Sequence, residues 1–327
     1  MADTFNNDFA QFVQKRIRPA IDMIAVRKRS GLFLALLIAI GVFAVFALAA
    51  YFIITPYQKL LGEYRISSWP FILLTPFALA ALGFAITYIL SLRNIVTEFR
   101  ETLVNRMAEF IDPALTRQTV LREPDQTVLR DSLLFGGTGQ PVSGTDRFLG
   151  CSGEASVEFR DIHIPPDKNA NNAESLTGIF MKAMYPKAFR EPLFVFPQEA
   201  EASRSALEQG LRDKGEAPRG GLVRIDDART LRQILKPAEA PGWGDGFLST
   251  AAGAKVDILR SEQGSELYLG CFGRDLYLAF LSRDKRMEFP GMFEGFDFGN
   301  YREFCREAKT AMAVARELGD RTDLWKS

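Results

Sequence analysis

A thiol and an imidazole together can act as nucleophile and general base, and this chain offers one such combination. Cys151 stands before an expected turn near Ser152, and His163 is the single histidine of the chain. If both lie on one β-hairpin, the turn leaves His163 ten residues along its strand. At about 3.3 Å per residue, this separates the thiol from the imidazole by roughly 30 Å. We therefore expect no catalytic dyad and interpret His163 as a hydrogen-bonded strand residue.

An Asn-rich segment has part of the spacing of a calcium-binding loop. Asp167, Asn169 and Asn171 match the first, third and fifth ligand positions. The sixth position is Asn172, where the loop needs glycine for a sharp turn. The twelfth is Gly178, where it needs a bidentate glutamate. The segment is typical of a polar surface loop, and we predict no metal site.

Two acidic pairs lack any partner that would mark them as an acid–base couple. Glu158 and Asp161 lie on an expected strand. Asp226 and Asp227 are interpreted as the first turn of a short helix toward Leu231, because acidic side chains stabilise helix N-termini. We therefore predict no catalytic residue and no cofactor-binding residue.

Composition limits the kinds of ligand or partner that the protein could bind and the compartment in which it could lie. The Gly-rich residues 136–144 are followed by no Gly-Lys-Ser/Thr, so we interpret them as a flexible connection rather than a phosphate loop. Basic and acidic residues number 40 each, which argues against a nucleic-acid partner. Three cysteines, far apart in the sequence, favour a reducing compartment over a disulfide scaffold.

Two long uncharged stretches dominate the first third of the chain. Ser30–Tyr57 and Ile66–Leu92 each exceed the roughly 20 residues that cross about 30 Å of hydrocarbon. Pro56 is expected to end the first helix. The connecting loop holds only Lys59 and Arg65 as basic residues, whereas basic residues cluster before the first stretch and follow the second. The positive-inside rule then predicts an inner-membrane protein with two spans and both termini cytoplasmic.

A basic, amphipathic helix is expected before the first span. Apolar residues recur at helical spacing from Phe5 to Ile24, and Pro19 should bend or split this helix. One interpretation is an interfacial helix that contacts anionic lipid through its basic residues, namely Arg16, Arg18, Arg27, Lys28 and Arg29. In the alternative, which we favour slightly, its apolar face packs on the cytoplasmic domain and the basic residues only set the topology.

The same spacing returns after the second span, over Ile95–Ile111, and predicts a helix that ends near Asp112–Pro113. This apolar stripe could be a dimer seam, but it is more typical of a core face. Beyond the linker, alternating patterns predict strands at residues 147–151, 155–164, 177–185, 192–196, 222–225, 266–272 and 275–281. Helices are expected at residues 199–214 and 301–318. Hairpins followed by a closing helix indicate an α+β fold with an antiparallel sheet.

Several short pieces of the chain carry a family resemblance: Arg18–Pro19, Arg27–Lys28, Asp146–Gly150, Glu158, His163, Gly178–Phe180, Pro186–Phe189 and Leu318 to Lys326. Their order resembles bacterial two-pass membrane proteins that carry the domain of unknown function 3137, over most of the chain. The chain departs from that family at residues 233–257, where a Pro/Gly-rich stretch replaces a more acidic and aromatic one. The resemblance implies no activity, and no catalytic residue can be carried over from it.

The sequence therefore predicts a membrane α-helical hairpin plus a cytoplasmic α+β domain. Its expected parts are an amphipathic helix (1–30), a first span (31–55), an external loop (56–65), a second span (66–92), juxtamembrane helices (93–135), a linker (136–144) and the domain (145–327). The function predicted is a membrane-anchored interaction or scaffold module whose partners are the lipid bilayer and an unidentified protein. The alternative is a membrane-attached enzyme or small-ligand sensor whose site the sequence does not show.

Overall fold

The computed structural model describes residues 2–63, 69–118, 126–135, 147–165, 175–198, 204–227, 232–240, 251–283 and 298–326, with the single residues 142, 144 and 200. The chain forms two compact units. One comprises residues 7–106 and 291–294 and is built from long helices. The other comprises residues 1–6, 107–290 and 295–327 and contains a sheet.

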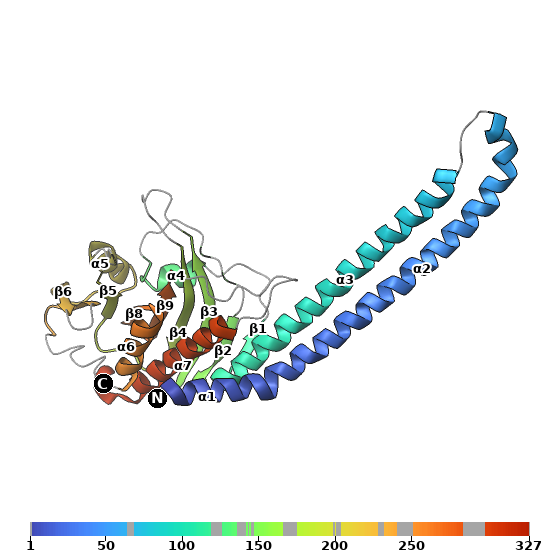
Figure 1. Cartoon of the computed structure of the whole chain (residues 1–327). Coiled ribbons are helices and arrows are strands. Elements are labelled where there is room, and N and C mark those ends of the chain that lie inside the picture. Colours follow the sequence, from blue (N-terminus) through green and yellow to red (C-terminus); the bar gives the residue numbers. More distant parts are fainter. Residues whose placement is uncertain are drawn as a thin grey trace. The chain divides into compact units, whose positions relative to one another are not determined.

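Two long helices make up the helical unit, α2 (Arg18–Glu63) and α3 (Trp69–Ile111), whose last turn already belongs to the sheet unit. The Arg27 guanidinium donates to the Glu98 carboxylate, so the helices lie side by side and run antiparallel (Figure 1). The predicted end of the second helix, next to Pro113, is confirmed.

Just before Pro19, where a bend or break was predicted, the helix contains a π-helical turn, which is wider than an α-helical turn. Helix α1 (Ala2–Phe12) is joined to α2 by the π-helical segment Val13–Ile17. In that segment the Arg18 N–H bonds to the carbonyl of Val13, five residues back. Pro19 has no N–H with which to continue the regular pattern, and the wider turn accommodates this loss without ending the helix.

The prediction that Pro56 ends the first helix is wrong, because α2 continues to Glu63. Most of the loop expected at residues 56–65 is therefore helical, and its last two residues lie outside the described part of the chain. A proline in a helix removes one backbone hydrogen bond, and helices rich in apolar residues tolerate it where neighbouring bonds persist.

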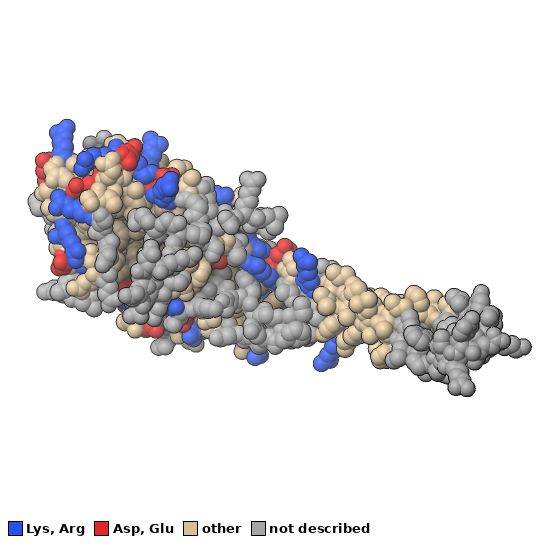
Figure 2. Space-filling model, turned by 90° about the horizontal axis from the view of Figure 1, so that it is seen from above, with Lys and Arg blue, Asp and Glu red and all other residues tan. Residues whose placement is uncertain are grey.

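Exposed large apolar side chains gather on these two helices. Among the described residues, all lie between Met23 and Leu90 except Met184 and Ile225. The 21-residue segment Arg29–Ala49 could span a membrane, since as a helix it covers about 31 Å. A shorter apolar segment, Phe77–Ser91, lies on α3. Figure 2 shows blue and red surface giving way to tan along the helices. One helix that could cross a membrane is thus confirmed, and the second span stays a prediction.

The sheet contains nine described strands, all paired antiparallel: β1 (Thr116–Gln118), β2 (Arg147–Ser152), β3 (Ala155–Ile164), β4 (Leu176–Met184), β5 (Leu193–Pro197), β6 (Leu222–Asp227), β7 (Arg232–Pro237), β8 (Glu266–Phe272) and β9 (Asp275–Ser282). Their order is β1-β2-β3-β4-β9-β8-β5-β7-β6. The α+β class with an antiparallel sheet and a C-terminal helix is therefore confirmed.

The long helix α7 (Phe298–Asp320) covers one face of this sheet, over β2, β3, β4 and β9 (Figure 1). Alternate strand residues point toward it, because successive side chains of a strand face opposite sides. The Phe304 ring lies 6.3 Å from Phe148 and 6.4 Å from Phe159, centroid to centroid. A second helix, α6 (Ala251–Gln263), packs beside α7 and against β8.

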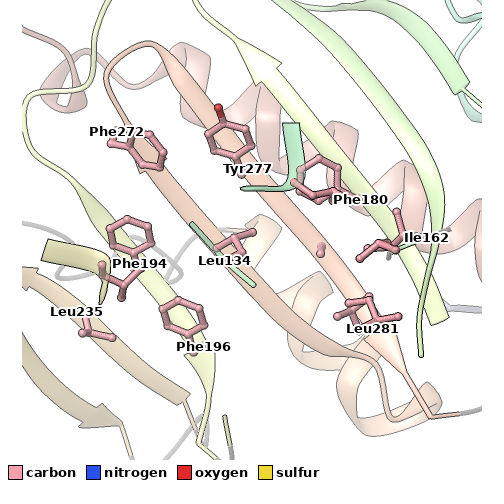
Figure 3. Packing of buried hydrophobic residues seen from close by; sticks show 14 of the residues in the cluster. Leu134, Ile162, Phe180, Phe194, Phe196, Leu235, Phe272, Tyr277 and Leu281 are labelled. Carbon is pink, nitrogen blue, oxygen red and sulfur yellow. The ribbon is translucent and has the colours of Figure 1, made fainter. Parts of the chain in front are cut away.

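The opposite face carries an apolar core that extends from β3 and β4 over β9, β8, β5 and β7. Its side chains include Phe180, Tyr277, Phe194 and Leu235 from the strands, with Leu134 lying over them (Figure 3). Leu134 follows the short helix α4 (Gln126–Asp131), and helix α5 (Arg204–Asp213) adds two leucines to the same cluster. The sheet is thus covered on both faces in this half.

Several local predictions change. Asp226 and Asp227 end strand β6 rather than beginning a helix, because they pair with Gln233 and Arg232 of β7 in the ladder. The Asn-rich loop of residues 167–172 lies outside the described residues, as does most of the Gly-rich linker. Elements β1, β7 and α6 were not predicted, whereas α4 lies within the range of the juxtamembrane helices expected at residues 93–135. Of these, β7 and α6 fall at residues 233–257, where the chain departs from the family pattern.

Candidate interaction surface

The face opposite α7 is polar where it crosses the other half of the sheet. Three cross-strand rows follow from the register of β2, β3, β4 and β9. They are Arg147–Arg160–Phe180, Leu149–Glu158–Lys182–Tyr277, and Cys151–Ser156–Met184–Asp275. We call the polar members, together with Cys151 and Met184, the charged face. Charged side chains thus occupy strand positions that are apolar in the neighbouring half of the same face.

Glu158 lies between two arginines of this face. Arg147 and Arg160 stand directly opposite each other on β2 and β3. The Glu158 carboxylate accepts a bond from Arg147 Nη2 at 2.7 Å and one from Arg160 Nε at 2.6 Å. Burial alone would raise the pKa of Glu158, but the bonds from the two arginines outweigh it and lower that pKa below its ordinary value of 4.5. One carboxylate therefore bonds to two cations on neighbouring strands, which leaves this group with a net charge of +1.

A second polar group lies on β4 and β9. Lys182 Nζ is 3.1 Å from Asp275 Oδ2, and the Tyr277 hydroxyl donates to the same oxygen at 3.0 Å. The Lys182 ammonium is also 5.4 Å from the centroid of the Tyr277 ring. Burial of Tyr277, and then the nearby negative charge of Asp275, raise the pKa of the phenol. The phenol therefore stays a neutral hydrogen-bond donor.

The third row of the charged face is open to solvent. Cys151 and Ser156 are exposed, and Met184 is 51% exposed, although it lies on a strand whose central residues are buried. Flexible methionine beside charged and aromatic side chains is common in protein-binding surfaces. Chemically, this arrangement presents charged, aromatic and methionine side chains able to form ion pairs and apolar contacts.

The structure keeps apart the residues considered as catalytic pairs. Cys151 faces Ser156 in the register, and His163 lies seven residues further along β3. This is about 23 Å at 3.3 Å per residue, so the thiol and the imidazole are too far apart on the hairpin to act together. Glu158 and Asp161 are separated by three positions and point to opposite faces of β3. Within the described residues, no group of three His, Cys, Asp or Glu side chains could hold a metal ion.

The basic residues predicted to contact lipid remain at the surface. Arg16, Arg18 and Arg29 are exposed, Arg27 is paired with Glu98, and the side chain of Lys28 lies outside the described part. Exposure is compatible with both interpretations of these residues, so contact with anionic lipid stays a prediction.

The first turn of α1 supports the alternative in which this helix packs on the chain's own domain. The Phe5 ring lies 5.9 Å from that of Phe110, and both belong to the sheet unit. The Lys309 ammonium of α7 is 3.6 Å from the Phe110 centroid and 5.7 Å from that of Phe5. An ammonium at such distances from an aromatic face is a cation–π contact.

Comparison with protein-family models, with curated proteins and with solved structures finds no match to this chain. The resemblance to two-pass membrane proteins therefore stays a prediction. The charged face itself was missed in the sequence, but one signal for it was present. On strand 155–164 the even positions begin Ser156, Glu158, Arg160, while the odd ones begin with small or apolar residues. This alternation identifies a strand with one polar face.

Proposed function

We propose that the protein is a two-pass inner-membrane protein, with both termini cytoplasmic, whose sheet unit docks a protein partner on the charged face. The observation that carries this proposal is the charged face itself, a four-stranded surface of charged residues with Met184 exposed beside them. Two helices with outward apolar side chains support the membrane anchor.

Outward side chains of α3 support the second span. Phe77, Leu82, Ile86, Ile89 and Leu90 are each at least half exposed to solvent in the isolated chain. In water, exposure of this much apolar surface on one helix is unfavourable, at about 25 cal/mol per Å². Lipid acyl chains would cover the exposed apolar surface of both helices. Ala35 of α2 and Ala80 of α3 are buried, as small residues at a contact between membrane helices are.

The natural Cys151 is a reporter of topology, because it is exposed while Cys271 and Cys305 are buried. In right-side-out membrane vesicles, a membrane-impermeant maleimide should label Cys151 only after the vesicles are opened. Labelling of Cys151 in sealed vesicles would place the sheet unit outside and refute the proposed orientation.

Photo-crosslinking tests the docking surface in the full-length protein in its native membrane. A crosslinking residue at Ser156 should form an adduct with one defined protein, and one at Arg302, exposed on α7, should not. Arg160→Glu should abolish the Ser156 adduct by reversing a charge of the face, whereas Arg224→Glu on the edge strand β6 should leave it intact. Equal adducts at both positions would contradict docking on this face.

One observation favours the second candidate, a small-ligand sensor. The buried guanidinium of Arg232 has a donor nitrogen, Nη1, without a hydrogen-bond partner in the described part of the chain. This site lies on the face of β7 toward α6, away from the charged face.

A further inference from the structure

Strand β7 buries an unusual run of polar side chains. Arg232 is 2% exposed, Gln233 2% and Lys236 3%. Long cationic side chains are almost never fully buried unless they are paired. The Gln233 amide donates to the carbonyls of Gln198 and Ala200, so its burial is satisfied within the chain and Arg232 is the residue to be explained.

The two cations share one face of the strand. Gln233 and Leu235 point toward the apolar core below α5, because Leu235 belongs to that cluster. Arg232 and Lys236, at even positions, therefore point to the other face. There Arg232 Nη2 donates to Asp257 Oδ1 of α6 at 2.6 Å, which confirms this orientation. Two buried cations thus lie on the α6 side of β7.

The guanidinium of Arg232 is only partly satisfied. It has five N–H donors in a planar fork suited to carboxylate or phosphate. Nη1 is buried and has no hydrogen-bond partner in the described part of the chain. An unpaired buried donor of a charged group is strongly unfavourable. Asp257 occupies one side of the fork, and its side chain is 49% exposed.

The first turn of α6 lies close to the same place. Side chains of a helix lean toward its N-terminus, so the Asp257 carboxylate that meets Arg232 lies over the turn around Gly253. Gly253 is itself buried. The N–H groups of a first helical turn, and the helix dipole, both favour negative charge. The positive end of the α6 dipole therefore lies on the side toward which the Asp257 side chain leans.

We propose that Arg232 is the centre of an oxyanion-binding site between β7 and the first turn of α6, which takes a phosphate or carboxylate group of a small soluble ligand. The oxyanion accepts hydrogen bonds from Nη1 while Nη2 stays with Asp257. This site is separate from the charged face, and its function would be to sense the ligand rather than to transform it.

Equilibrium dialysis of the full-length protein in detergent tests the site directly. Radiolabelled inorganic phosphate and malonate serve as the two probes, at constant ionic strength set with chloride. The wild-type protein should bind one of them, and the probe that binds identifies the class of oxyanion. Arg232→Gln should weaken that binding at least tenfold, whereas Arg224→Gln, which changes an exposed arginine on β6, should leave it unchanged.

Asp257→Asn provides a second arm in case Arg232→Gln fails to fold. Removal of the competing carboxylate should tighten binding of the same probe severalfold, because the guanidinium loses the counter-charge that Asp257 supplies. If the wild-type protein binds neither probe, the proposal is overturned. This is the result expected if a bound water satisfies Nη1. Binding that Asp257→Asn leaves unchanged or weakens, or that Arg232→Gln in folded form leaves unchanged, overturns it as well.

Discussion

Glu158 is the residue on which the charged face depends. Because Arg147 and Arg160 stand opposite each other, Glu158→Gln leaves two cations side by side with a weaker acceptor between them. The Glu158 side chain is 18% exposed, so the loss is only partly screened by solvent. We expect the free energy of unfolding to fall by about 1–2 kcal/mol. Urea titration of the detergent-solubilised protein measures this, with Glu317→Gln on α7 as the control.

The same carboxylate predicts a pH dependence. Its pKa is lowered in the folded protein, so the unfolded state binds the proton more readily. Its contribution is therefore complete above the ordinary pKa of 4.5 and is lost as the pH falls through the lower folded value. The stability difference between wild type and Glu158→Gln should shrink between pH 5 and about pH 3. A difference that stays constant over this range would contradict the assigned pairing.

Thiol reactivity should separate the three cysteines. Burial raises the pKa of the Cys271 thiol to about 12 and also raises that of Cys305, whereas Cys151 is exposed. The thiolate is the reactive form of cysteine. One thiol per protein should therefore react quickly with a maleimide at pH 8, and the other two should react only when the protein unfolds. Mass spectrometry after timed labelling identifies the modified residue. Fast reaction of Cys271 would show that β8 opens in the native state.

At the residue scale, the sequence was informative where the distance between two candidate residues could be calculated. The fixed rise per residue of a β-strand was enough to place Cys151 too far from His163 for the two to act together. The roles of Arg232 and Glu158 could not be found in this way. Asp257, the partner of Arg232, lies on α6 and reaches β7 only through helix packing. Arg147 lies across the predicted β2–β3 hairpin from Glu158, but periodicity does not give the register that brings the two side chains together.

At the scale of elements, Gly178 tests how closely β4 and β9 approach each other. A Cβ at this position would lie 1.8 Å from the backbone oxygen of Phe280, which cannot move without separating the two strands. We expect Gly178→Ala to destabilise the protein by at least about 3 kcal/mol. The control is Gly41→Ala, where nothing lies within 4 Å of the added Cβ. Circular dichroism during urea unfolding compares the two, and similar midpoints would contradict the strand register.

Prediction of the elements from the sequence depended on local pairing. The hairpin of β8 and β9 was found because a short turn at Gly273 joins two clearly apolar runs, and Gly273 has a φ of 56°. Strand β7 was missed, since its buried Arg232, Gln233 and Lys236 give it the composition of a surface segment. Its neighbours are β5 and β6, and the pairing with β5 crosses long stretches of sequence. Hydrophobic periodicity carries no information on such partners.

At the scale of the whole molecule, the charge pattern and the apolar surface give the same membrane placement. Basic residues flank the apolar parts of α2 and α3 at the ends that meet through Arg27 and Glu98. The apolar side chains of both helices point outward over the stretches beyond that ion pair. An antiparallel helical pair inserted across a bilayer would satisfy both features, with the sheet unit on the basic side.

Insertion of α3 can be tested through its outward residues. Leu82→Arg combined with Ile86→Arg places two charges on the lipid-facing side, at a cost of about 5–7 kcal/mol to insertion. We expect α3 to remain outside the bilayer, so that the sheet unit is exported and Cys151 reacts with impermeant maleimide in sealed right-side-out vesicles. Glu101→Arg, exposed on the same helix beyond the apolar stretch, is the control and should leave Cys151 protected. If the double variant also keeps Cys151 protected, α3 does not cross the membrane and a two-pass topology is wrong.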